Sequence, residues 1–163
     1  MKLTAREGKE LAILLKRLGG NTWLPENVFL AIHAAVSMWA PELVIVRQRQ
    51  GRKEMLLTPY DGVFRRSYWH IPGGYNLRDE TMQQSCSRIA RRELGFDVRA
   101  QKIMDAYKWT AQEHPYGRPL SLYVLCRPVR RIKEHARMKF FPVRHLPKKM
   151  MPAHRKFIEK NLW

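Results

Sequence analysis

The stretch WHIPGGYNLRDETMQQSCSRIARRELGF, residues 69–96, combines residue types that suit a phosphate group and a metal ion. Gly73 and Gly74 let the backbone approach a ligand closely and adopt angles that other residues avoid. A helix is predicted to follow over residues 79–94, and the free N–H groups at a helix start favour phosphate. Near its end, Glu93 offers a carboxylate, the kind of ligand that Mg²⁺ prefers. The stretch therefore predicts a site for phosphate and metal.

One carboxylate is all that the relevant helix face provides. Positions 89, 92 and 93 share this face because they are three and four residues apart, and they hold Ile89, Arg92 and Glu93. Ile89 cannot bind a cation, and Arg92 would repel one. A plainer interpretation gives Glu93 a salt bridge with Arg88 or Arg92 instead of a metal, so the spacing alone leaves both roles open.

The elements that must position this stretch include helices and strands. Thr4 and Glu7 form a capping-box pattern at the start of a first helix, and Pro25 suits the first turn of a second. A short strand is predicted just before the glycines. The other predicted strands cover 42–49, 53–60, 98–112, 120–129 and 138–143, and a last helix covers 152–163. This order predicts an α/β or α+β sandwich around a mixed sheet.

The composition fits one folded domain. The chain has 163 residues with 45% hydrophobic side chains, which is enough to bury a sizeable core. No apolar run approaches the roughly 20 residues that span a bilayer, so no membrane span is expected. Cys86 and Cys126 belong to no zinc or disulfide pattern, and we expect buried, reduced thiols in a cytoplasmic protein.

The charge is strongly basic. The chain carries 31 Lys and Arg against 14 Asp and Glu, a formal net charge of +17. Residues 127–160 concentrate it, with twelve basic residues against two acidic ones. Such a field attracts anionic ligands, which include nucleotides, nucleic acid and membrane surfaces. It does not choose between these partners, and a solvated basic face accounts for it equally well.

The pattern between the glycines and the end of the predicted helix is more specific than its parts. It resembles the Nudix box, G-x5-E-x7-R-E-U-x-E-E-x-G-U, where U is a bulky apolar residue. The positions that match in register are Gly74, Glu80, Arg88, Glu93, Gly95 and Phe96. The resemblance covers roughly residues 40–160 and identifies the chain as MutT-like. It implies a single Nudix domain over 1–163, with an N-terminal helical extension over 1–40 and the Nudix core over 41–163.

The resemblance implies a fold and a metal site. The fold would be the Nudix α/β/α sandwich with a mixed central sheet and the two N-terminal helices added. The activity would be that of a hydrolase with Mg²⁺ or Mn²⁺, held by Glu93 and the carbonyl of Gly73. Gly74, Glu80 and Gly95 would be structural, with Arg88 joining the loop to the helix. Because Ile89 and Arg92 replace two glutamates of the box, the usual site for several metal ions is not expected.

One Nudix branch, the GDP-mannose mannosyl hydrolases, has nearly the same loss. Its box is similar to RIARRELG here, and it uses one metal ion and a histidine base to release the sugar from GDP. The segment KEHARMKFFPV, residues 133–143, looks like the part of that branch that carries the base. The resemblance makes His135 the candidate base, the carbonyl of Glu134 a metal ligand, and Arg88 a contact of the leaving diphosphate.

The match to that branch is incomplete on the substrate side. Tyr75 stands where the branch has an arginine, and Tyr60 aligns with a second one. Other basic residues lie near enough in sequence to substitute. The candidates for substrate or phosphate contacts are therefore Arg65, Arg66, Tyr75 and Arg78. His70, beside the box, is an alternative base.

These observations predict a Nudix hydrolase that acts on a nucleoside diphosphate linked to another moiety, above all a nucleotide sugar. Two alternatives stay open. One is a catalytically impaired Nudix domain that binds a nucleotide or RNA. The other is conventional pyrophosphate hydrolysis with ligands recruited from Asp79, Glu113 or Glu134. A small-molecule nucleotide is the expected partner, nucleic acid is a second one because of the charge, and a homodimer is kept as an open assembly state.

Overall fold

The computed structural model describes residues 3–18, 24–36, 38–60, 67–114, 118–135 and 137–163. The chain divides into two compact units, Met1–Val36 and Ser37–Trp163. The first unit holds helices α1 (Ala5–Leu18) and α2 (Glu26–Ala35). At the start of α1, Glu7 accepts a hydrogen bond from the Thr4 amide and Thr4 Oγ1 accepts one from the Glu7 amide, at 2.7 and 3.3 Å. The predicted capping box is therefore confirmed.

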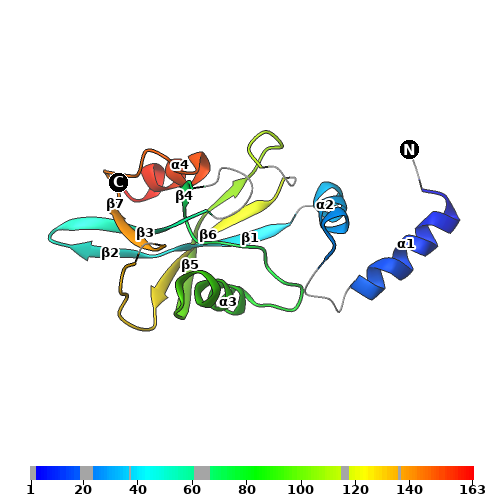
Figure 1. Cartoon of the computed structure of the whole chain (residues 1–163), viewed down its shortest axis with the longest axis horizontal. Coiled ribbons are helices and arrows are strands. Elements are labelled where there is room, and N and C mark those ends of the chain that lie inside the picture. Colours follow the sequence, from blue (N-terminus) through cyan, green and yellow to red (C-terminus); the bar gives the residue numbers. More distant parts are fainter. Residues whose placement is uncertain (1–2, 19–23, 37, 61–66, 115–117, 136) are drawn as a thin grey trace. The chain divides into compact units, whose positions relative to one another are not determined.

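The second unit is built on two sheets (Figure 1). In the first sheet, β6 (Leu120–Pro128) lies between β1 (Trp39–Val44), which runs parallel to it, and β5 (Val98–Lys108), which runs antiparallel. In the second sheet, β3 (Arg52–Pro59) pairs antiparallel with each of its partners, β2 (Val46–Arg49), β4 (Trp69–His70) and β7 (Lys139–Pro142). The long hairpin predicted from the sequence is the β5–β6 pair.

A helix covers each face of these sheets. Successive strand residues point to opposite faces, so Leu43 packs in the cluster beneath α3 (Met82–Leu94) and Val44 packs in the cluster beneath α4 (Pro152–Asn161). Tyr123 and Val124 of β6 divide in the same way, toward α4 and α3. This two-sided burial explains why the central strands are apolar at consecutive positions. The predicted α+β sandwich is confirmed, although two sheets replace the single mixed sheet that was expected.

Several predicted boundaries are wrong. The strand expected over 98–112 ends at Lys108. The strand expected over 42–49 is interrupted at Ile45, so its first half belongs to the first sheet and its second half to the other. The helix expected from Asp79 begins at Met82, because Thr81 caps it and Gln84 completes a capping box. At the other end Gly95 has φ 72°, the left-handed cap expected of it.

Among the described residues, no helix is both long enough and apolar enough to cross a membrane. Cys86 and Cys126 are free and buried, as predicted. Ile89 is fully buried in the core beneath α3, so the residue that replaces the first glutamate of the box is a packing residue.

Candidate functional site

A cavity of about 500 Å³ lies beside the C-terminal end of α3. Its volume is in the range of pockets that bind small molecules. Strands β3 and β4, the glycine turn, the last turn of α3 and the segment before β7 all contribute to its wall. The lining residues are Thr58, Pro59, Tyr60, His70, Gly73, Arg92, Glu93, His135 and Arg137. The cavity therefore unites the retained glutamate of the box with both candidate bases.

Glu80 and Arg88 hold the loop between the glycines and α3. Arg88 donates to both carboxylate oxygens of Glu80, at 2.5 and 2.7 Å, and to the carbonyl of Tyr75 at 2.8 Å. Glu80 also accepts from the amide of Leu77 and the hydroxyl of Ser85, at 3.0 and 2.7 Å. The hydrogen bonds from Arg88 are the main reason that the pKa of Glu80 falls to about 2. This geometry fits the structural role expected for the pair.

The two glycines permit close approach without unusual backbone angles. A methyl group on Gly73 would overlap the carboxylate of Glu42, and one on Gly74 would lie 2.9 Å from a guanidinium nitrogen of Arg92. Among the described glycines, positive φ values occur at Gly51 and Gly95. The expectation of unusual angles at 73 and 74 is therefore wrong. Both glycines let a side chain of the protein come close, and their close approach to a ligand stays a prediction.

The first turn of α3 takes no part in the cavity. Thr81 Oγ1 accepts from the amide of Gln84, and the Gln84 side chain accepts from the Thr81 amide, at 3.3 and 2.8 Å. No first-turn residue of α3 is among those that line the cavity. The phosphate site expected at this helix start is therefore separate from the cavity, which lies at the other end of α3, and it stays a prediction.

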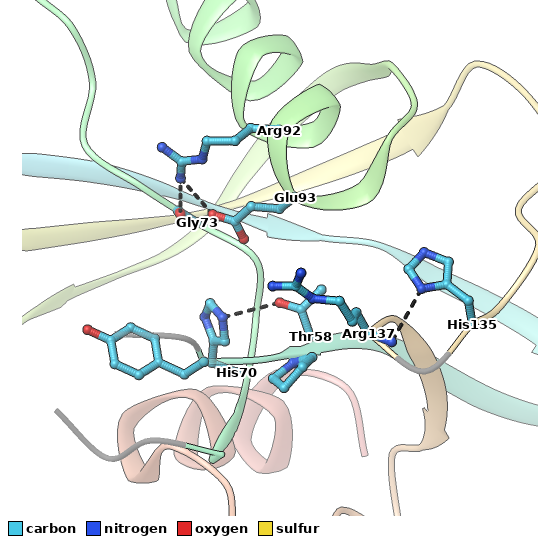
Figure 2. Close-up of a pocket in the computed structure, with 9 residues that line it drawn as sticks. Thr58, His70, Gly73, Arg92, Glu93, His135 and Arg137 are labelled. Atoms are coloured by element: carbon cyan, nitrogen blue, oxygen red, sulfur yellow. Dashed lines mark hydrogen bonds and ion pairs between the residues drawn. The ribbon is translucent and has the colours of Figure 1, made fainter. Parts of the chain in front are cut away.

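Arg92, Glu93 and Gly73 meet at one side of the cavity (Figure 2). A guanidinium nitrogen of Arg92, Nη2, lies 2.7 Å from Glu93 Oε1 and 3.4 Å from the carbonyl oxygen of Gly73. These two oxygens are the ones that the Nudix resemblance assigns to the metal. The salt bridge between Glu93 and Arg92, which the sequence left open, is therefore present.

A buried polar cluster lies behind Gly73. Glu42 accepts a hydrogen bond from Ser121 at 2.7 Å, and Ser121 in turn accepts one from the indole N–H of Trp109 at 2.9 Å. Burial raises the pKa of Glu42 to about 8, with a smaller contribution from the charge of Glu93. His154 Nε2 lies 3.9 Å from Glu42, and burial holds the pKa of this histidine well below its usual value. The wall behind the glycine turn is thus polar and well packed.

The segment that carries His135 is tied to the second sheet through its neighbour. The carboxylate of Glu134 accepts from Arg47 at 2.7 Å and from the amide of Phe140 at 3.0 Å. The guanidinium of Arg47 also lies 3.8 Å above the ring of Phe140. His135 Nδ1 accepts a hydrogen bond from the amide of Arg137 at 3.3 Å, so a neutral ring has its lone pair at Nδ1.

His70 of β4 and Tyr60, the residue after β3, line the same cavity. His70 Nε2 lies 3.2 Å from the hydroxyl of Thr58, and its ring makes an edge contact with Tyr60 at 5.4 Å between centroids. Figure 2 shows His70 across the cavity from Glu93, with Arg137 and His135 on the side of β7. Two histidines on separate segments therefore reach one cavity.

Several other predicted site residues lie elsewhere. Arg78 is exposed and pairs with Asp79 at 3.5 Å, while Glu113 accepts from the hydroxyl of Tyr107 at 2.6 Å. None of the lining residues is among the other candidates, which are Tyr75, Arg78, Asp79, Arg88, Glu113 and Glu134. Arg65 and Arg66 lie outside the described residues.

Two oxygen ligands, the Glu93 carboxylate and the Gly73 carbonyl, are of the kind that one hydrated divalent ion uses. The described residues contain no group of three or more His, Cys, Asp and Glu side chains placed to hold a metal. Mg²⁺ needs only one or two carboxylates when water and substrate phosphates complete its coordination. Glu93 and the Gly73 carbonyl fit that minimal set once the side chain of Arg92 has moved off them.

Sequence reasoning missed Glu42 and Arg137. Glu42 stands directly before the apolar run LVIV, and a glutamate is rarely buried without partners, which was the available signal. Arg137 is one of many basic residues in its segment, and no sequence signal separates it from the others. Its place in the cavity follows from the fold alone.

Comparison with known proteins tests the fold. No protein-family model matches the chain, and curated proteins gave no match. Among solved structures, C. elegans Ap4A hydrolase superimposes with a TM-score of 0.61 and 17% identity, over 77% of this chain and 95% of that one. A MutT NUDIX hydrolase from Burkholderia pseudomallei gives a TM-score of 0.58 and 19% identity, over 76% and 97%. A UDP-X diphosphatase gives 0.59 and 15%, over 95% and 79%. The chain therefore has the Nudix fold.

Proposed function

We propose that the protein is a hydrolase of a nucleoside diphosphate linked to another moiety, with a nucleotide sugar as the substrate class. The observation that carries this proposal is the shared cavity, whose wall includes Glu93, Gly73, His135 and His70. Arg92 and Arg137 bring two positive charges to the same wall. Guanidinium groups bind phosphate oxygens through paired, charge-assisted hydrogen bonds, so a diphosphate is the ligand that this lining favours.

The chain's own groups divide the work. Arg137 and Arg92 would hold the diphosphate, and Tyr60 adds an aromatic ring to the lining of the cavity. Glu93 and the Gly73 carbonyl would hold Mg²⁺ or Mn²⁺, which when bound offsets the negative charge of the diphosphate. Arg88 stays with Glu80 and keeps the glycine turn in place.

The proposed reaction is attack of water on the sugar carbon. The water oxygen forms a bond to that carbon, the bond from the carbon to the diphosphate oxygen breaks, and the diphosphate keeps the electron pair. His135 would take the proton from water at Nδ1, in exchange for its 3.3 Å hydrogen bond from the Arg137 amide. His70 is the alternative base, because it faces the same cavity.

The test is product analysis after incubation with Mg²⁺ or Mn²⁺. The panel holds nucleotide sugars, dinucleoside polyphosphates and nucleoside triphosphates, and NMR identifies the products. We expect a free sugar and a nucleoside diphosphate from a nucleotide sugar, and loss of this turnover in Glu93→Gln with the fold intact. Turnover that survives Glu93→Gln would remove the metal assignment.

A non-catalytic binding domain is the second candidate, and the Arg92–Glu93 ion pair favours it. This pair places a positive charge on the oxygens that a catalytic metal would use. Such a domain would bind a nucleotide or RNA, produce nothing with any divalent metal, and lose affinity steeply with salt. Absence of product across the panel, together with salt-sensitive binding, would favour this function over hydrolysis.

A further inference from the structure

The guanidinium of Arg92 lies where the resemblance to Nudix proteins expects a metal ion. It contacts Glu93 Oε1 at 2.7 Å and the carbonyl of Gly73 at 3.4 Å (Figure 2). Arg92, which directly precedes Glu93 in α3, thus places its guanidinium group next to both oxygens. The same oxygens cannot hold a divalent ion and this guanidinium at once.

The glycine turn provides the space that the guanidinium uses. A methyl group on Gly74 would lie 2.9 Å from Arg92 Nη2, so the absence of a side chain there lets the arginine approach the turn. Ile89 also borders this space, 3.6 Å from the same methyl position. The position of the Arg92 guanidinium is therefore set by Gly74 and Ile89, which both belong to the box.

The ion pair is positioned but exchangeable. The side chain of Arg92 is 58% exposed, while that of Glu93 is 19% exposed. An ion pair with one exposed partner contributes little stability, because water competes for the guanidinium. Arg92 can therefore leave the two oxygens when another anion offers equal or better hydrogen bonds. A diphosphate in the adjoining cavity is such an anion, since guanidinium binds phosphate oxygens strongly.

We propose that Arg92 is a tethered cation that covers the Gly73–Glu93 oxygens in the unliganded protein and turns onto the diphosphate of the ligand. The site then takes up a divalent ion together with a diphosphate and excludes the bare ion. Arg92 acts as a selectivity residue in the empty site and as a phosphate-binding residue in the filled one. The inference rests on the proposed function only in requiring that a diphosphate enters this cavity.

The first test measures bare-metal affinity without any turnover. Titration with Mn²⁺, followed by the electron paramagnetic resonance signal of free Mn²⁺, compares the wild-type protein with Arg92→Gln. Removing a positive charge next to the ion should tighten Mn²⁺ binding roughly tenfold. The matched control is Arg91→Gln, because Arg91 is the neighbouring arginine and pairs with Asp97 away from the cavity at 2.5 Å. Its Mn²⁺ affinity should equal that of the wild-type protein.

A second variant locates the ion. In the double variant Arg92→Gln/Glu93→Gln, the added affinity for Mn²⁺ should disappear, because the carboxylate that binds the ion is gone. If the double variant keeps the tighter binding, the ion lies elsewhere and the inference is overturned. Arg92→Lys keeps the charge and should exclude the bare ion as the wild-type protein does.

The second test uses inorganic pyrophosphate in the presence of Mg²⁺, followed by calorimetry. Arg92→Gln should weaken this binding roughly tenfold, since it loses a charge-assisted hydrogen bond to phosphate. Arg91→Gln should not change it. One substitution thus shifts the two affinities in opposite directions, which loss of structure would not produce.

Failure of either shift overturns the inference. Unchanged or undetectable Mn²⁺ binding in Arg92→Gln would show that Arg92 does not exclude the ion. Unchanged pyrophosphate binding would show that it does not reach the diphosphate. Neither measurement depends on catalysis. Opposite shifts of the two affinities without hydrolysis would retain this inference and reject the hydrolase. Hydrolysis without these shifts would retain the hydrolase and reject this inference.

Discussion

The buried carboxyl group of Glu42 fills the space beside the α-carbon of Gly73. The two residues pair as an antiparallel bridge between β1 and the glycine turn, and the carboxyl carbon of Glu42 lies 2.7 Å from the position of a methyl group at 73. The carbonyl of the same glycine faces Arg92 and the cavity. The contact between the Glu42 carboxyl group and Gly73 therefore fixes both the packing of Glu42 and the position of the Gly73 carbonyl, the proposed ligand.

Gly73→Ala should destabilise the fold by about 1–3 kcal/mol, the usual cost of forcing extra volume into a packed site. Neither Glu42, which is 7% exposed, nor the main chain of Pro41 at 3.1 Å can move away easily. Urea denaturation measures the change. Glu42→Ala in the same chain makes room for the new methyl group, so the double variant should cost less than the sum of the two single ones.

Gly74→Ala is the contrasting substitution. Its methyl group would meet the mobile end of Arg92 at 2.9 Å and no backbone atom among its nearest neighbours. We expect a smaller loss of stability than for Gly73→Ala, together with tighter Mn²⁺ binding because Arg92 is displaced. If Gly73→Ala and Gly74→Ala lowered the free energy of unfolding equally, the difference expected from their neighbouring atoms would be contradicted.

Glu80→Gln should destabilise the protein at pH 7 by about 2 kcal/mol, since Glu80 loses its ionic bond with Arg88. The folded-state pKa of Glu80 is about 2, below the ordinary value of 4.5. Its contribution is therefore present above pH 4.5 and is lost as the pH falls through 2. Denaturation of both proteins from pH 7 to pH 3 should show the difference shrinking on the acid side. Asp79→Asn, at an exposed neighbour, should change little at any pH.

His135→Gln should reduce kcat about 10²–10⁴-fold if His135 takes the proton from water, the usual contribution of a general base. His70→Gln should cost much less, because His70 is the alternative base and its Nε2 already lies 3.2 Å from the hydroxyl of Thr58. Steady-state kinetics on the best substrate of the panel compare the two. A larger loss of kcat in His70→Gln would indicate that His70 is the general base.

Chelation with EDTA should abolish turnover without lowering the temperature of unfolding. The core of the Ser37–Trp163 unit packs through apolar side chains beneath α3 and α4. We therefore expect its folding to need no ion. Activity assays and differential scanning calorimetry on the same sample separate the two effects. A lower unfolding temperature after chelation would indicate a structural metal.

The sequence predicted the part of the site that local spacing determines. Glu80 and Arg88 are eight residues apart, and the structure joins them at 2.5 Å, as their register in the box implies. Gly95 ends the helix in the left-handed conformation that glycine favours. These features depend on few neighbours, so a motif is enough to find them.

The remaining features depend on long-range packing. Glu42 reaches Gly73 because β1 lies next to the turn, and no local pattern encodes that pairing. The position of Arg92 depends on the space above Gly74, so the sequence showed a repelling charge but not where it rests. The interruption at Ile45 likewise arises because neighbouring residues join different sheets.

The most direct test of the central claim is hydrolysis of a nucleotide sugar in ¹⁸O-labelled water, followed by ³¹P NMR. Attack at the sugar carbon predicts a nucleoside diphosphate whose phosphorus signals carry no isotope shift, with the label in the free sugar. A shifted phosphorus signal would place the attack at phosphorus, and absence of any product would leave the cavity as a binding site. Either result would contradict the proposed reaction.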